Sequence, residues 1–67
     1  MIELKAPQGK FRVIGVDTFD HTEWISGDFN TKEEAIKHAE KEVEDEEMLK
    51  MHIYDDKGKH LYDCGIY

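Results

Sequence analysis

The sequence of 67 residues has one cysteine, one proline and no long apolar run. The single cysteine, Cys64, excludes a disulfide within the chain and the usual zinc sites built from several thiolates. We therefore expect a fold held by packing alone, as is typical of a reducing compartment. No run reaches the length of a membrane span, and the start, MIELKAPQGK, has no apolar core of signal-peptide length. These absences predict a cytoplasmic protein without a membrane partner.

Positive charge is scarce as well. Nine lysine and arginine residues stand against 16 aspartate and glutamate residues, which gives a net charge of −7 at pH 7. Such a surface repels nucleic acid phosphates and favours a basic partner. The sequence also lacks a glycine-rich phosphate loop, a G-x-S-x-G elbow and an H-E-x-x-H motif. Together with a core too small for an interior substrate cavity, this predicts a protein that is not an enzyme and needs no cofactor.

Four short segments rich in alternating or β-branched apolar residues predict four strands. They are KFRVIGVD (10–17), EWISGDF (23–29), LKMHIYD (49–55) and KHLYD (59–63). The first two form one hairpin and the last two form another. The turn D-D-K-G predicts a three-residue loop closed by Gly58 in the left-handed conformation. This loop pairs Ile53 with Leu61 and Tyr54 with His60.

The segment between the hairpins carries the strongest helix signal. Thr31 and Glu34 form a capping box, in which the hydroxyl accepts from the Glu34 amide and the carboxylate reaches back. Apolar residues follow at helical spacing, at Ala35, Ile36, Ala39 and Val43. Carboxylates crowd the last turns, where they oppose the helix dipole, so we expect fraying there.

The order of these segments predicts one small α+β domain over residues 1–67, with a lead-in at 1–9. Its architecture is β-β-α-β-β, a four-stranded antiparallel sheet with one helix packed on one face. The order of the strands within the sheet stays open, because two hairpins can be joined in more than one way.

Strand periodicity predicts which side chains the helix covers. The covered set is Phe11, Val13, Ile25, Phe29, Leu49, Met51, Ile53 and Leu61. The opposite face then carries Arg12, Ile14, Val16, Trp24, Lys50, His52, Tyr54, His60 and Tyr62. That face is semi-apolar and aromatic, and no second helix covers it. Exposed patches of this kind usually mark an interaction surface.

Three interpretations of that face remain open. It binds another protein or a second copy of the chain, it stacks single-stranded bases on its aromatic rings, or Trp24 folds over the sheet to complete a small core. We predict the first, a non-catalytic protein-interaction module that uses this face or an edge strand, with a homodimer as one form. The predicted partner-binding residues are Trp24, Tyr54, Tyr62, His52, Ile14 and Arg12. The alternative function is a nucleic-acid-associated or antitoxin-like accessory protein.

Two groups of polar residues have the composition of a metal site. The loop residues Asp17, Asp20, His21 and Glu23 lack the EF-hand spacing and offer only one histidine. The other pair, His52 and His60, is predicted to lie on one sheet face, where adjacent strands could hold a transition metal ion. A solvated loop and exposed strand residues are the commoner forms of these patterns, so we assign no metal ligand.

The stretch from Gly27 to Ile36, G-D-F-N-T-K-E-E-A-I, resembles the strand-to-helix junction F-x-T-x-E-E-A of many small α+β proteins. It is similar to the junction in antitoxins of hic-type toxin–antitoxin pairs, which have a sheet with one packed helix. It also resembles small uncharacterised bacterial proteins with two hairpins around a helix. The resemblance implies this fold, an antitoxin-like accessory role for the first group, and no activity for the second.

Overall fold

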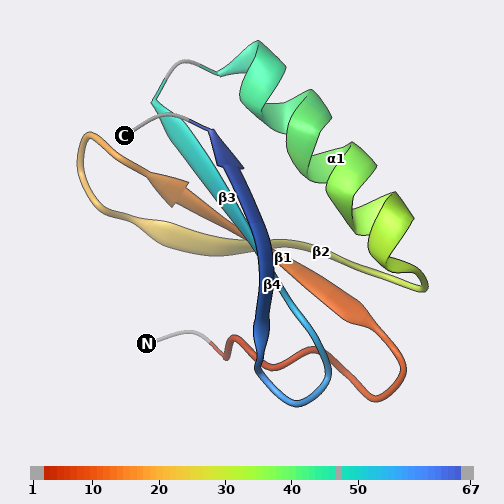
Figure 1. Ribbon diagram of the computed structural model, residues 1–67. Coiled ribbons are helices and arrows are strands. Elements are labelled where there is room, and N and C mark those ends of the chain that lie inside the picture. The colour runs from red at the N-terminus through yellow and green to blue at the C-terminus, as the bar shows by residue number, and fades with distance from the viewer. Residues whose placement is uncertain (1–2, 47, 66–67) are drawn as a thin grey trace.

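The computed structural model describes residues 3–46 and 48–65. It contains the strands β1 (Phe11–Asp17), β2 (Glu23–Phe29), β3 (Leu49–Tyr54) and β4 (His60–Gly65), and the helix α1 (Lys32–Asp45) (Figure 1). All neighbouring strands are antiparallel and follow the order β2-β1-β3-β4. The predicted β-β-α-β-β fold is therefore confirmed. The two hairpins join through β1 and β3 at the centre of the sheet.

The hydrophobic core lies between α1 and one face of the sheet, and Figure 1 shows α1 lying along one side of the strands. Its buried members are Val13, Ala35, Ala39, Leu49, Met51 and Ile53. The two alanines give α1 a narrow contact side with small side chains, which lets the helix lie close to the central strands. Partly buried residues surround this centre, among them Phe11, Phe29, Ile36 and Val43.

Capping fixes the beginning of α1. The N-cap Thr31 accepts a hydrogen bond from the Glu34 N–H at 3.1 Å, and its hydroxyl lies 3.2 Å from Glu34 Oε1. The Glu34 carboxylate thus reaches back to the N-cap residue and accepts from the Thr31 hydroxyl. At the other end, Glu46 is extended and the last turn of α1 has no basic residue. The negative end of the helix dipole therefore meets carboxylates there and no cation from that turn.

The second hairpin closes through the predicted three-residue loop. Asp55 N–H donates to Lys59 O at 3.0 Å, Gly58 N–H donates to Asp55 O at 3.1 Å, and Gly58 has a φ of 83°. The Asp55 carboxylate also accepts from the Lys59 and Lys57 amides at 2.8 and 2.9 Å. These two backbone hydrogen bonds hold the pKa of Asp55 below its ordinary value.

A β-bulge interrupts the edge strand β2, which sequence periodicity did not predict. Gly27 lies opposite Val13, but the next pair is Ile25 with Ile14, so Ser26 is the extra residue. An extra residue reverses the facing of everything beyond it. Ile25, predicted beneath the helix, consequently shares the opposite face with Ile14 and is 44% exposed.

A second bulge interrupts the other edge strand, β4. His60 pairs with Tyr54 as predicted, but Ile53 pairs with Tyr62, so the predicted pair of Ile53 with Leu61 is wrong. Leu61 is the extra residue of this bulge. Tyr62 therefore takes the predicted place of Leu61 and packs against the buried core beneath α1. As in β2, the extra residue reverses the side of the sheet to which the residues after it in β4 point.

The lead-in segment is tied to the second hairpin. Ala6 is 3% exposed, and its N–H donates to Asp55 O at 3.0 Å. Gly9 N–H donates to Asp56 Oδ2 at 2.9 Å. Within residues 3–9, these contacts anchor the chain beside the end of β3 before β1 begins.

Candidate functional sites

Trp24 lies on the sheet face that α1 covers, so its predicted place on the opposite face is wrong. It pairs with Gly15, and a Cβ atom added to Gly15 would come within 2.4 Å of the indole ring. Gly15 shares the facing of the buried Val13 two residues earlier. The cause of the reversal is the bulge at Ser26. The absence of a side chain at Gly15 provides the room for the ring, which remains 39% exposed.

Tyr62 also lies on the helix side, contrary to prediction. It pairs with the buried Ile53 and packs against the core. Its hydroxyl donates to Glu40 Oε2 of α1 at 2.9 Å, and this hydrogen bond raises the pKa of Tyr62. The bulge at Leu61 is the reason that sequence parity failed here. Tyr62 therefore joins α1 to the edge strand.

The other four predicted partner-binding residues do lie on the face opposite α1, which we call the far face. Ile14 is only 1% exposed and offers no docking area. Arg12 donates to Asp28 through Nε at 2.7 Å and Nη2 at 3.1 Å, and this pairing raises its pKa. His52 and Tyr54 are half-buried. The six predicted residues therefore do not form one exposed aromatic surface.

The acidic loop between β1 and β2 is a hydrogen-bonded turn. Asp17 Oδ1 accepts from the Phe19 N–H at 2.8 Å. Asp20 Oδ1 accepts from the Thr22 hydroxyl at 2.8 Å and its N–H at 3.1 Å, which lowers the pKa of Asp20. His21 has a φ of 64° at the turn. The four candidate residues of this loop do not converge into a metal-sized group in the structure described.

A pocket of about 230 Å³ opens beside Trp24, where the end of α1 approaches the end of β1 and the start of β3. Its lining residues are Asp17, Trp24, Glu42, Glu46, Met48, Leu49 and Met51. Three of these side chains are carboxylates, and the others are an indole, two thioethers and an isobutyl group. None of the described lining residues is basic. We call this site the Trp24 pocket.

The electrostatics of the Trp24 pocket favour a cation. Glu42 comes from the last turn of α1 and Glu46 is its C-cap residue, and the helix dipole adds partial negative charge at this end. The face of an indole ring attracts cations as well. The His38 imidazole contacts one of these carboxylates, because its Nε2 lies 3.6 Å from Glu42 Oε1; the same nitrogen lies 2.7 Å from Ser26 Oγ. The carboxylates, the helix dipole and the indole ring of the Trp24 pocket therefore all attract a cation.

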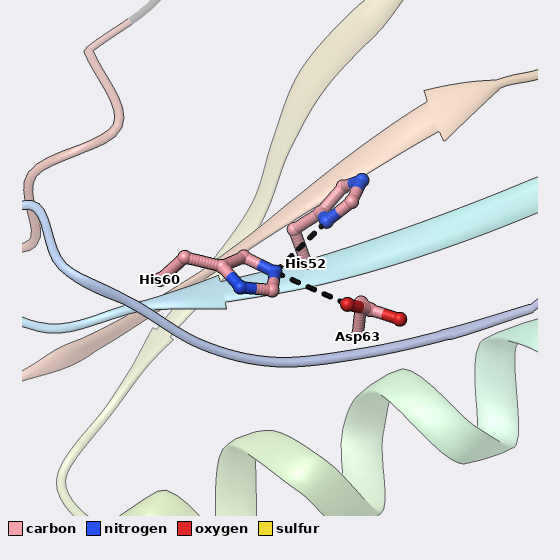
Figure 2. Close-up of side chains that lie close together, drawn as sticks. All are labelled: His52, His60 and Asp63. Atoms are coloured by element: carbon pink, nitrogen blue, oxygen red, sulfur yellow. Dashed lines mark hydrogen bonds and ion pairs between the residues drawn. The ribbon is translucent and has the colours of Figure 1, made fainter.

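A second cluster lies on the far face, where two histidines and an aspartate meet. Figure 2 shows His52 from β3 and His60 and Asp63 from β4 converging above the sheet. His52 Nδ1 lies 3.1 Å from His60 Nε2, and that nitrogen lies 3.5 Å from Asp63 Oδ2. Their ligand atoms all lie within 4.8 Å of one another. We call these three residues the histidine cluster.

Neighbouring side chains orient the histidine cluster. Tyr54 packs edge-on against His60, with ring centroids 5.3 Å apart. Lys50 Nζ lies 3.5 Å from Asp63 Oδ1, the oxygen that faces away from the His60 contact. Burial lowers the pKa of His52, and the neighbouring His60 lowers it further.

Sequence reasoning brought His52 and His60 together but missed Asp63. Residues three apart in a regular strand face opposite sides, so parity separated Asp63 from His60. The bulge at Leu61 removes that separation. The sequence did contain a signal for Asp63. If the apolar Cys64 is paired with the buried Met51, Asp63 falls directly opposite His52.

Sequence reasoning also missed the Trp24 pocket. Carboxylates at the helix end, Glu42 and Glu46 among them, were expected only to oppose the helix dipole and to favour fraying. Placing them near an aromatic ring required knowing that Trp24 had changed faces.

Comparison with protein-family models, curated proteins and solved structures finds no match. The similarity to hic-type antitoxins therefore stays a prediction from ten residues, Gly27 to Ile36. In the part of the chain that is described, no helix has the length and apolar character needed to cross a membrane.

Proposed function

We propose that this chain is a non-catalytic interaction module that binds a lysine or arginine side chain of a partner protein in the Trp24 pocket. The observation that carries the proposal is the meeting of three carboxylates with one indole ring. A lysine or arginine side chain complements both the charge and the apolar part of the pocket. Its apolar stem can contact the indole ring and the thioethers while its charge meets the carboxylates.

The size of the Trp24 pocket supports a single side chain as its occupant. At about 230 Å³ it is smaller than the ~300–1,000 Å³ of typical small-molecule sites. The pocket is open to solvent at the surface, as a side chain carried by another protein requires. The net charge of −7 would attract a basic partner over a longer range and raise its association rate.

The end of α1 gives a further reason. Glu42, Glu46 and the helix dipole repel one another in the free protein, because no basic residue occupies the last turn. A bound cation relieves that repulsion. A binding partner would thus stabilise the end of α1.

Edge-strand pairing is a weaker basis for a partner. Both edge strands, β2 and β4, contain a bulge that interrupts the regular row of free backbone groups. Bulged edges resist addition of another strand. We therefore assign the interaction to the Trp24 pocket, and sedimentation at several concentrations tests the predicted homodimer separately.

Titration of the intrinsic Trp24 fluorescence with a tetralysine peptide tests the proposal, because the chain has no other tryptophan. We expect a saturable emission change that a tetraglutamate peptide does not produce. Replacing both pocket glutamates, Glu42→Gln with Glu46→Gln, should weaken binding by roughly fivefold or more, the equivalent of ~1 kcal/mol.

A matched variant controls for net charge. Glu44→Gln with Asp45→Asn removes the same charge from the same helix end, at exposed residues that do not line the pocket. It should bind nearly as tightly as the wild type. No saturable change with tetralysine, or equal weakening in the two double variants, would overturn the proposal.

A further inference from the structure

We propose that His52, His60 and Asp63 bind a divalent transition metal ion of the zinc type on the far face of the sheet. This site lies on the opposite side of the sheet from the Trp24 pocket, and it does not depend on the function proposed above. Two imidazoles and one carboxylate are a donor set that suits Zn²⁺, Co²⁺, Ni²⁺ and Cu²⁺. Ca²⁺ and Mg²⁺ prefer oxygen ligands and should bind poorly.

The distances between the donor atoms suit one small ion. A tetrahedral ion with bonds of ~2.0–2.1 Å keeps its ligand atoms about 3.3 Å apart. His52 Nδ1 and His60 Nε2 are 3.1 Å apart, and His60 Nε2 and Asp63 Oδ2 are 3.5 Å apart. The remaining separation, between His52 and Asp63, is no more than 4.8 Å and needs only a side-chain adjustment.

The backbone holds the three ligands on one side of the sheet. His52 and Asp63 lie directly opposite each other across β3 and β4. His60 joins them because Leu61 is bulged, and Tyr54 supports the ring of His60 from the side. Bulges often re-aim a side chain at functional sites. A ligand set carried by paired strands is more rigid than one carried by a loop.

The exposure of the cluster determines the kind of site. His60 and Asp63 are exposed, so three protein ligands would leave at least one coordination position open to water or to a donor atom from another molecule. Lys50 contacts Asp63 Oδ1, which leaves Oδ2 directed toward His60. The arrangement is that of an open three-ligand site and not of a closed structural zinc site.

Cobalt absorption spectroscopy tests the site on the untagged chain. We expect one equivalent of Co²⁺ to give visible bands of four- or five-coordinate geometry, and Zn²⁺ to displace it. His60→Ala and Asp63→Asn should each lower the affinity by about 10- to 100-fold or more. Thermal melting without metal shows whether each variant is still folded.

The control is His21→Asn. His21 is exposed in the β1–β2 turn at a φ of 64°, a conformation that asparagine tolerates well. This variant should bind Co²⁺ like the wild type. The proposal is overturned if the wild type gives no bands at saturating Co²⁺, if folded His60→Ala binds as tightly as the wild type, or if His21→Asn abolishes binding. In those cases the cluster is a hydrogen-bonded histidine pair that only joins β3 to β4.

Discussion

Gly15→Ala is the substitution that most sharply probes the position of Trp24. The new methyl carbon would lie 2.4 Å from Cε2, 2.5 Å from Cζ2 and 2.7 Å from Nε1 of the indole. Ordinary carbon contacts begin near 3.4 Å, so the ring must withdraw by about 1 Å or the strands must separate. Overpacking of this kind costs ~1–3 kcal/mol. Because the ring is 39% exposed and can move outward, we expect the lower half of that range.

Gly27→Ala is the matched control, because it measures the effect of replacing a strand glycine by alanine without the clash against the indole. Its methyl carbon would lie 3.1 Å from the Phe29 ring, which needs to yield by only a few tenths of an ångström. Alanine regains about 0.5–1 kcal/mol relative to glycine in either strand. The difference between the two variants therefore isolates the clash with the indole.

Urea unfolding followed by Trp24 emission measures this difference. We expect Gly15→Ala to be less stable than Gly27→Ala by ~1–2 kcal/mol and to emit at longer wavelength in its folded state. Equal stabilities with unchanged folded-state emission would refute the placement of the indole over Gly15.

Three further predictions concern the cap, the second hairpin and the cysteine. Thr31→Ala removes the N-cap of α1 and should lower the free energy of unfolding by about 1 kcal/mol, whereas Thr31→Ser should preserve it; chemical denaturation would contradict this if both behaved alike. The lowered pKa of Asp55 stabilises the fold above its ordinary value of 3.8, and this contribution is lost as the pH falls through the lowered pKa. Wild type should therefore exceed Asp55→Ala in stability at neutral pH, with the gap narrowing in acid; a constant gap would argue against it. Burial raises the pKa of the Cys64 thiol, so iodoacetamide should alkylate it more slowly in the folded chain than in urea at pH 8; equal rates would show an accessible, ordinary thiol.

The central strands were predictable from the sequence because each is paired on both sides. In β3 the alternation of Leu49, Met51 and Ile53 with polar residues matches their burial, and Val13 in β1 follows the same rule. An extra residue in a strand bonded on two sides disturbs two ladders, so bulges are less common there than at the edges. Periodicity is therefore a dependable guide to facing in such strands.

The edge strands were not predictable in the same way. β2 and β4 each have one neighbour, so a bulge disturbs a single ladder and leaves no strong trace in residue type. The bulge at Ser26 places Trp24 on the helix side of the sheet. The bulge at Leu61 places Tyr62 on that side and Asp63 beside the two histidines. Both candidate sites thus depend on the two extra residues that sequence periodicity overlooked.

Nuclear Overhauser effects from the indole protons of Trp24 offer the most direct test of the bulged geometry. The structure predicts strong effects to the α-protons of Gly15, because the ring lies within 2.4 Å of the position that a Cβ would occupy there. Effects to the side chains of Ile14 or Tyr54 instead, with none to Gly15, would place the ring on the far face and contradict the Trp24 pocket.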